Sequence, residues 1–266
     1  MFYHIIADGR ILKNALLEID TVLGTNAALA ASGEERKYLY ETMLHDLPYM
    51  KAIFHETLRM YPPVPKNGKF AVADDVLPDG TFIEKGDMIA YSDYSLGRSR
   101  SVWGEDAEVF SPERWLIDVK DSKDGVKDGA TGARSVSPFG KCRVESPHKF
   151  HSFNSGPRLC LVRQHGQLHR LKAFFPLSVH VHVYFFLVLT SLFQSPLQGQ
   201  TFATVEAMVT SCIIIQNYDL KLVPNRPKPE IKASAILPML RPLLVYATKK
   251  SDSILSSASR SKTVPL

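Results

Sequence analysis

The sequence predicts a mainly α-helical protein with a small antiparallel β region. Two segments, residues 11–23 and 47–61, have apolar side chains at helical spacing, and a third predicted helix includes residues 206–216. Between residues 69 and 94 the pattern changes to short strand-like pieces separated by turns. A chain of 266 residues with 45% hydrophobic residues is long enough to form one large domain or part of one.

Composition and charge exclude several classes of function. The formal net charge is +5 and the isoelectric point is about 9.0, but no lysine or arginine block is dense enough to indicate nucleic-acid binding. The three cysteines, Cys142, Cys160 and Cys212, are odd in number and have no paired spacing, which favours a reducing compartment. The first ten residues contain neither a signal-peptide core nor a membrane anchor.

The first predicted helix covers residues 11–23 and ends before Gly24. Its apolar stripe consists of Leu12, Ala15, Leu16, Ile19 and Leu23. Within it, Asp20 and Thr21 are an acid followed by an alcohol, a pair that can deliver protons to bound oxygen in one enzyme family. The surrounding residues 18–24 instead resemble the next helix of that family, so we interpret the pair as having no catalytic role.

The second predicted helix covers residues 47–61. Pro48 suits the first helical turn, and Pro62 and Pro63 end the helix. Glu56 and Arg59 are three residues apart and therefore share one face. On an ordinary helix such a pair is a solvated surface contact of little energetic value.

The chain after this helix is predicted to form strands, a loop and a final helix. Residues 69–73, 76–80, 81–83 and 88–94 are the predicted strands, and residues 118–137, rich in Asp, Lys and Gly, are predicted to be a mobile loop. Residues 206–216 continue a helix that begins near Gly199, and residues 218–223 form a strand. The serine-rich segment 251–266 is predicted to be disordered.

Residues 153–161, Phe-Asn-Ser-Gly-Pro-Arg-Leu-Cys-Leu, have the composition of a loop that presents a thiolate. A thiol binds metal only as thiolate, and its pKa falls beside positive charge or at a helix N-terminus. Arg158 places a positive charge two residues before Cys160, while Gly156 and Pro157 allow a tight turn. Alone, a cysteine among apolar residues is more often a buried and inert side chain.

This segment resembles the haem-binding loop of the cytochromes P450. Phe153, Gly156, Arg158 and Cys160 match the pattern of that loop, whereas Val162 stands where its final glycine is expected. The resemblance implies that Cys160 ligates the iron of haem b, that Phe153 packs beneath the macrocycle and that Arg158 pairs with a propionate.

Two upstream motifs resemble the same family. Glu56 and Arg59 match its Glu-x-x-Arg helix, and residues 110–115, Phe-Ser-Pro-Glu-Arg-Trp, are similar to its Pro-Glu-Arg-Phe or Pro-Glu-Arg-Trp segment. The resemblance implies that Glu56, Arg59 and Arg114 form a buried ionic network. It also implies that Pro63, Val64 and Pro65 face the substrate, that Lys66 or Lys69 reaches a propionate, and that residues 233–247 form a terminal hairpin near the substrate.

Residues 162–198 resemble nothing expected of the family. Removing them would join Leu161 to Gly199 and restore the missing glycine, so we interpret them as an insertion, and we hypothesise that they are translated from an unspliced intron. The predicted organisation is residues 1–161 as family sequence, 162–198 as the insertion, 199–250 as the remainder and 251–266 as a tail. No earlier segment resembles the family's oxygen-activating helix, so the N-terminal half of the fold is expected to be absent.

The insertion leaves two alternatives open. Residues 174–193 carry no Asp, Glu, Lys or Arg and are long enough to span a bilayer or to make a membrane contact, although Pro176, His180 and His182 interrupt them. His165 and His169 could mimic a zinc site with Cys160, but such spacing is more often accidental. The insertion is also expected to move the following helix, whose N-terminal amides would favour the thiolate.

The function that the resemblance implies is haem-thiolate monooxygenation, an iron-dependent oxidoreductase reaction. Its expected partners are a P450 reductase, O2 and a small apolar substrate such as a fatty acid or alkane, and its expected place is the cytosolic face of the endoplasmic reticulum membrane. The interrupted chain is expected to have little turnover. The alternative is a non-catalytic fragment that acts at most as a haem or membrane binder.

Overall fold

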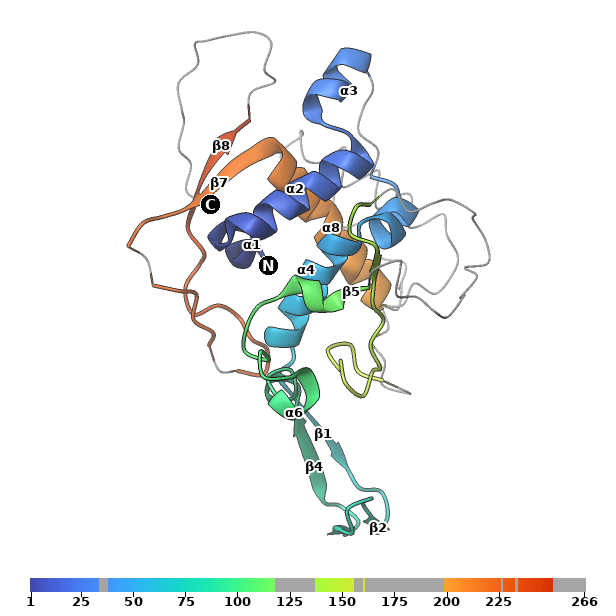
Figure 1. Ribbon diagram of the computed structural model, residues 1–266. Helices are drawn as coiled ribbons and strands as arrows, with labels where there is room; N and C mark the ends of the chain where they lie inside the picture. Colours follow the sequence, from blue (N-terminus) through green and yellow to red (C-terminus); the bar gives the residue numbers. More distant parts are fainter. Residues whose placement is uncertain are drawn as a thin grey trace, which may run out of the picture.

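The computed structural model describes residues 1–33, 38–117, 137–155, 160, 199–225, 227–232 and 234–250. In this part of the chain, helices pack together into one body and a β hairpin extends away from it (Figure 1). The described strands form only two-stranded antiparallel sheets. The predicted mainly α-helical class with a small β region is therefore confirmed.

The chain begins with three helices, α1 (Phe2–Ala7), α2 (Gly9–Leu23) and α3 (Asn26–Ser32). The Asp8 carboxylate caps α2 by accepting the backbone N–H of Arg10 at 2.9 Å. Gly24 follows the helix with φ 81°, a conformation that favours glycine. The sequence placed the end of α2 correctly but started it two residues late and missed α1.

The next helix, α4 (Pro48–Met60), follows the short π-helical segment η1 (Thr42–Asp46). Leu47 precedes α4 and provides no capping side chain. The Glu18 carboxylate of α2 takes this role, because it accepts the backbone N–H of Tyr49 at 2.9 Å and that of Met50 at 2.8 Å. One helix thus caps the first turn of another.

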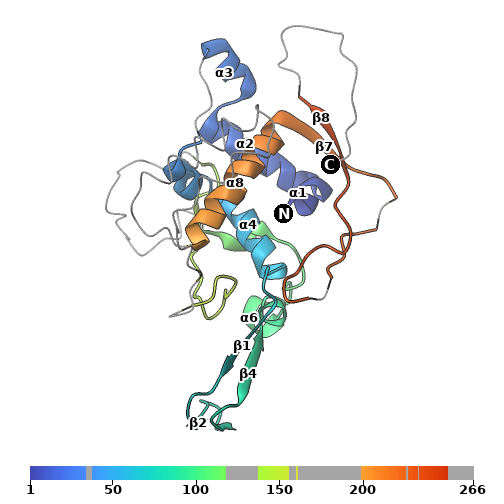
Figure 2. The ribbon, with the colours of Figure 1, turned by 180° about the vertical axis from the view of Figure 1, so that it is seen from behind.

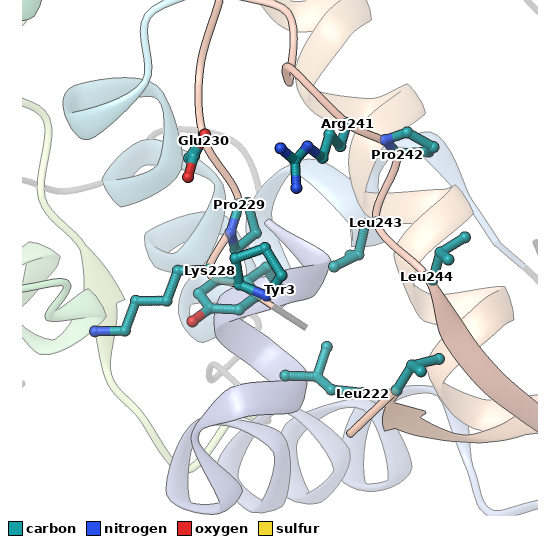
Figure 3. Close-up of a pocket in the computed structure, with 11 residues that line it drawn as sticks. Tyr3, Leu222, Lys228, Pro229, Glu230, Arg241, Pro242, Leu243 and Leu244 are labelled. Atoms are coloured by element: carbon teal, nitrogen blue, oxygen red, sulfur yellow. The ribbon is translucent and has the colours of Figure 1, made fainter. Parts of the chain in front are cut away.

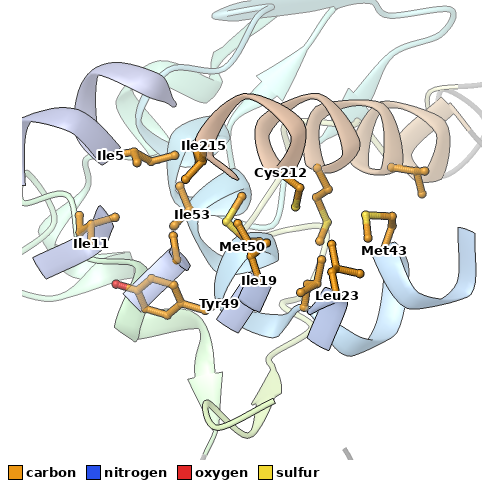
Figure 4. Packing of buried hydrophobic residues seen from close by; sticks show 14 residues of the cluster. Ile5, Ile11, Ile19, Leu23, Met43, Tyr49, Met50, Ile53, Cys212 and Ile215 are labelled. Atoms are coloured by element: carbon orange, nitrogen blue, oxygen red, sulfur yellow. The ribbon is translucent and has the colours of Figure 1, made fainter. Parts of the chain in front are cut away.

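The main hydrophobic core lies where α1, α2, η1 and α4 meet α8 (Gly199–Asn217) (Figure 4). Seen from behind, α8 crosses α2 and α4 (Figure 2). The core contains these fully buried side chains: Ile5, Ile11, Ile19, Met43, Met50, Ile53, Met208 and Ile215. The first residue of α8, Gly199, is hydrogen-bonded to Cys160, the predicted haem ligand. This core therefore fixes α8 beside that residue.

The projecting hairpin is formed by β1 (Lys66–Phe70) and β4 (Met88–Ser92), which pair antiparallel from Lys66 with Ser92 to Phe70 with Met88. At its far end β2 (Asp75–Val76) pairs with β3 (Phe82–Ile83). The first predicted strand, residues 69–73, is shifted: β1 starts at Lys66 and ends at Phe70.

A second, smaller core lies beside α4. It contains Ala52, Trp103, Ala107 and Trp115. Ala52 is on α4, Trp103 ends α6 (Arg100–Trp103), Trp115 ends the 3-10 helix η2 (Pro112–Trp115), and Ala107 lies between α6 and η2. The helix α5 (Asp93–Leu96) precedes α6, and the paired strands β5 (Leu116–Ile117) and β6 (Lys141–Cys142) follow η2. This cluster brings the Pro-Glu-Arg-Trp segment against α4.

The end of the described chain agrees only in part with the prediction of a hairpin at residues 233–247. A short antiparallel turn is present, because the Lys232 N–H donates to the Pro238 carbonyl at 2.9 Å and the Leu240 N–H to the Glu230 carbonyl at 2.7 Å. The last part of the predicted hairpin instead belongs to β8 (Val245–Lys249), which pairs antiparallel with β7 (Tyr218–Leu222). The segment between them contains one isolated bridge, from Ile231 to Met239. Pro238 and Pro242 remove two backbone donors from this segment, which explains the lack of a continuous ladder.

Several predictions concern residues outside the described ranges. The loop at 118–136, the insertion at 162–198, with its candidate membrane segment 174–193, and the tail at 251–266 all lie there. Among the described helices, none combines the length and the apolar composition that crossing a bilayer requires.

Candidate functional site

Glu56 is the centre of a buried ionic network on α4. Its side chain is 0% exposed, as is that of Arg59. Arg59 donates from Nε to Glu56 Oε2 at 2.7 Å and from Nη2 to Oε1 at 2.8 Å. Both residues lie on the same helix face, and the planar guanidinium binds the carboxylate in a bidentate manner.

The segment around η2 supplies three more donors to the same carboxylate. Arg114 Nε donates to Glu56 Oε1 at 3.0 Å, and Trp115 Nε1 donates to Oε2 at 2.9 Å. The backbone N–H of Ser111 donates to Oε1 at 2.8 Å. The structure therefore brings together Glu56, Arg59 and Arg114, the three residues for which the sequence predicted a network.

The two arginines also bind backbone carbonyls. Arg59 donates to the carbonyl of Ala107 at 2.6 Å and to that of Gly97. Arg114 is partly buried and makes a second ion pair with Asp106 at 2.9 Å. The hydrogen bond from Arg114 and its charge lower the pKa of Asp106. The network thus ties α4 to the chain that follows α5 and α6.

Cys160 lies at the N-terminal end of α8. Cys160 is exposed, and its backbone N–H donates to the carbonyl of Phe153 at 2.9 Å. The backbone N–H of Gly199 donates to the carbonyl of Cys160 at 3.0 Å. The expectation that the insertion moves this helix away from Cys160 is therefore wrong.

The other two residues of the predicted haem-binding set, Gly156 and Arg158, lie outside the described residues, as do His165 and His169. In the described ranges, no three histidine, cysteine or acidic side chains gather where they could hold a metal ion. Ligation of a haem iron needs one protein thiolate rather than such a cluster.

A mainly apolar cavity of about 420 Å³ lies between α4 and α8. Its volume is within the usual range of about 300–1,000 Å³ for ligand pockets. It is lined by Met1, Phe2, Phe54, Thr57, Leu58, Pro63, Phe153, Ala203, Glu206, Ala207, Thr210 and Ser211. Phe153 connects this cavity to Cys160, because its side chain lines the cavity and its carbonyl accepts the Cys160 amide.

The residues predicted to face the substrate are only partly brought to this cavity. Pro63 lines it, whereas Val64 and Pro65 do not, and Val64 is 42% exposed. The backbone N–H of Leu237 donates to the Pro63 carbonyl at 2.9 Å, so the segment between β7 and β8 reaches this end of α4. Lys69 lies over the Tyr91 ring at 5.8 Å.

A second cavity of about 120 Å³ lies between α1, the end of β7 and the segment that joins β7 to β8 (Figure 3). Tyr3, Leu222 and Leu243 line it, with Glu230 and Arg241 among its charged residues. Arg241, Pro242, Leu243 and Leu244 of its lining belong to residues 233–247, which the sequence predicted to lie near the substrate. None of the described residues of the predicted haem-binding set or ionic network lines it.

Sequence reasoning missed Glu18, which is 0% exposed. Burial raises the pKa of Glu18 to about 7, while hydrogen bonds from Ser137 and from the amides of Tyr49 and Met50 lower it. Glu18 follows Ala15 at helical spacing on the buried face of α2. That position was a usable signal, because a charged residue on an apolar stripe needs a partner.

Cys142 differs from Cys160 in its surroundings. Its sulfur lies 3.8 Å from Nδ1 of His55. Burial raises the pKa of Cys142 to about 11 and lowers that of His55 to about 3. Both groups are therefore neutral near pH 7, and the thiol is not activated.

Comparison with known proteins gives one consistent family. Residues 1–168 match the family model described as cytochrome P450. Cytochrome P450 704B1 of Arabidopsis thaliana is 42% identical over 125 residues, which cover 47% of this chain and 20% of that protein. Cytochrome P450 86B1 and alkane hydroxylase MAH1, also from Arabidopsis thaliana, are 31% and 32% identical over 207 residues, or 78% of this chain. These matches span 26% and 30% of the two relatives, so the chain corresponds to less than a third of their length.

Proposed function

Because the chain belongs to the cytochrome P450 family, we propose that it carries the haem-thiolate site of a monooxygenase, with Cys160 as the ligand of the iron of haem b. One observation supports this most: Cys160 is held at the N-terminus of α8, and Phe153 connects it to an apolar cavity of about 420 Å³ between α4 and α8. An accessible thiol beside an apolar cavity fits a haem ligand.

Each residue of the site has a separate proposed role. Cys160 supplies the thiolate, Arg158 supplies positive charge near it, and Gly156 permits the turn of the loop. Phe153 covers one side of the haem with an apolar ring. Bound haem supplies the redox-active iron, and a thiolate ligand increases electron density on that iron.

We propose that Glu56, Arg59 and Arg114 have a structural role. Glu56 and Arg59 have no exposed side-chain surface, and Arg114 is 12% exposed, so these groups cannot readily meet a substrate. Their contacts join α4, which lines the cavity, to η2 and the second core. The network would keep the face of α4 that lines the cavity, with Phe54, Thr57 and Leu58, in place when ligands bind and leave.

An apolar substrate is the class that fits best. The relative at 32% identity is named an alkane hydroxylase, and Phe54, Leu58 and Pro63 give the cavity apolar walls. Pro63 is the predicted substrate-facing residue with direct support from the cavity, while Val64 and Pro65 keep this role only as part of the proposal. We also propose a P450 reductase as electron donor, O2 as co-substrate and the cytosolic face of the endoplasmic reticulum membrane as location.

We further propose that residues 162–198 interrupt the family sequence, which comprises residues 1–161 and 199–250. The support is that Gly199 and Cys160 are hydrogen-bonded to each other although 38 residues separate them in the chain. Joining Leu161 to Gly199 would therefore leave both ends of the junction close to their present positions. A transcript that lacks these codons would support an intron origin, and its absence from every transcript would refute it.

Haem binding tests the proposal directly. The full chain and a variant with residues 162–198 deleted should be loaded with haem, reduced under carbon monoxide and examined for the Soret band of a thiolate-ligated haem. We expect the band in the deletion variant at higher occupancy, and we expect Cys160→Ala to abolish it in both backgrounds. Retention of the band in Cys160→Ala, or its complete absence from both parent chains, would refute the assignment.

A non-catalytic haem binder is the second candidate, because residues 162–198 would interrupt the family sequence directly after the proposed haem-binding loop. Turnover of an alkane or fatty acid with a reductase and O2 distinguishes the two. A chain that gives the thiolate spectrum but no hydroxylated product would be a haem binder.

A further inference from the structure

Residues 151–154, which precede Cys160, are held in place by side chains that have no role in the proposed haem chemistry. The carboxylate of Asp93, at the start of α5, is 4% exposed. One of its oxygens accepts Asn67 Nδ2 at 2.6 Å, and the other lies 3.2 Å from Nδ1 of His151. His151 is therefore attached to a buried acid that is itself attached to β1.

A second contact joins the same segment to β4. The Tyr91 ring meets the His151 ring edge to face at 5.1 Å, and the Tyr91 hydroxyl donates to Asn154 Oδ1 at 3.2 Å. Asn154 has φ 60°, a left-handed conformation that is uncommon outside glycine. Such a conformation persists only when the surrounding contacts hold it.

The held segment is a turn that positions Cys160. The backbone N–H of Asn154 donates to the His151 carbonyl at 2.8 Å, which closes the turn. Phe153 lies within it, and its carbonyl accepts the Cys160 N–H at 2.9 Å. A displacement of the His151 backbone would therefore displace the Cys160 backbone, because these two hydrogen bonds join the turn to Cys160.

We propose that Asp93 and His151 are positioning residues that fix the 151–154 turn and, through the Phe153 carbonyl, the place of the Cys160 thiol. The proposal rests on the role proposed above for Cys160 as the haem ligand. Neither residue lines the cavity of about 420 Å³.

Ser155 makes a different role conceivable, because Ser155, His151 and Asp93 have the order of a nucleophile, a base and an orienting acid. The Ser155 hydroxyl lies 3.5 Å from His151 Nε2, whereas working pairs are about 2.6–3.2 Å apart. The contact between His151 and Asp93 is the shorter of the two, so the geometry favours a role in holding the turn.

The chemistry of the pair explains why it would hold the turn firmly. A buried carboxylate that loses a hydrogen-bond partner is strongly disfavoured, since water does not replace that partner. Burial raises the pKa of Asp93, while the charge of His151 and the hydrogen bonds from Asn67 and His151 lower it. Removing the imidazole leaves this acid with Asn67 as its remaining side-chain donor among the described residues.

Residue-resolved amide hydrogen exchange on the full chain without haem tests the proposal. In His151→Ala we expect the amides of Asn154 and Cys160 to exchange at least about tenfold faster, while the amides of α4 keep their rates. His151→Asn can place a donor near the position of Nδ1 and should restore slow exchange. His148→Ala removes an exposed histidine three residues earlier and should leave every rate unchanged.

Two outcomes would overturn the proposal: unchanged exchange at Asn154 and Cys160 in His151→Ala, or equal acceleration in α4, which would mean that His151 holds the whole fold. On the haem-loaded chain, His151→Ala should lower the fraction of the carbon monoxide complex with a thiolate-type Soret band, and His151→Asn should restore it. If the parent chain shows no thiolate band while the exchange result is as expected, the haem assignment fails and the positioning of the turn stands.

Discussion

Replacement of Glu56 by glutamine tests whether the buried network stabilises the fold. The carboxylate accepts five hydrogen bonds, three at Oε1 and two at Oε2. Glutamine has the same shape, but its amide nitrogen cannot accept, so the donors that face that atom lose their partner. The change also removes the charge that neutralises Arg59, whose side chain is 0% exposed.

The expected loss is large compared with the stability of a domain. Removing one partner of a buried ion pair typically costs about 3–5 kcal/mol. Domains of ordinary stability unfold with about 5–15 kcal/mol, so Glu56→Gln should remove about a fifth or more of the free energy of unfolding. With an m-value of about 2 kcal/mol/M in urea, the unfolding midpoint should fall by roughly 2 M.

Urea unfolding followed by circular dichroism measures this effect. Glu105→Gln is the matched control, because Glu105 is 90% exposed and lies 3.6 Å from the exposed Arg100. Such surface pairs contribute about 0–1 kcal/mol, so the control should unfold close to the parent chain. A loss in Glu56→Gln below about 1 kcal/mol, or equal to that of Glu105→Gln, would refute the reasoning.

Three further predictions follow from the described residues. Burial raises the pKa of Glu18 to about 7 from 4.5. The stability that protonated Glu18 contributes is therefore complete below about pH 4.5 and is lost as the pH rises through 7. In urea unfolding, the parent chain should lose about 3 kcal/mol more free energy of unfolding than Glu18→Gln between pH 4.5 and 8. A Cβ atom on Gly97 would lie 2.0 Å from the Arg59 carbonyl oxygen, so Gly97→Ala should lower the free energy of unfolding by about 1–3 kcal/mol or more. The control Gly9→Ala places a Cβ atom that meets no atom within 4 Å and should not destabilise the fold. Equal urea midpoints for the two variants would contradict this prediction. A thiol reagent should modify Cys160 of the native chain rapidly, because Cys142 and Cys212 are more buried. The variant Cys160→Ala should therefore lose the fast phase of modification. An unchanged fast phase would show that another thiol reacts.

The sequence predicted the helices best where their ends carry strong local signals. For α4, Pro48 and Pro62 mark both ends, and the observed bounds differ from the predicted ones by one residue each. The start of α2 was placed late because its cap, Asp8, precedes two residues that are not apolar. The resemblance, rather than local pattern, indicated that Glu56 and Arg114 would meet, since they are 58 positions apart in the chain.

The features that the sequence missed depend on long-range contacts. Glu18 is buried because the first turn of α4 offers two free amides, and nothing in α2 alone reveals them. Similarly, β8 pairs with β7 across more than 20 intervening residues, whereas residues 233–247 were predicted to pair within themselves. Asp93 and His151 meet through the fold of the hairpin and the loop, 58 positions apart, so neither residue was a candidate from its own neighbourhood.

The position of the proposed insertion explains how a core can form around it. Cys160 and Gly199 are adjacent in space, as the hydrogen bond between the Gly199 amide and the Cys160 carbonyl shows. Closing a loop between adjacent ends becomes costlier only slowly with length, by about 0.6 kcal/mol for each doubling. The packing of α8 against α2 and α4 can therefore offset a long excursion of the chain. Any harm to the proposed thiolate site should then be local, so deleting residues 162–198 should change haem occupancy more than it changes the unfolding midpoint.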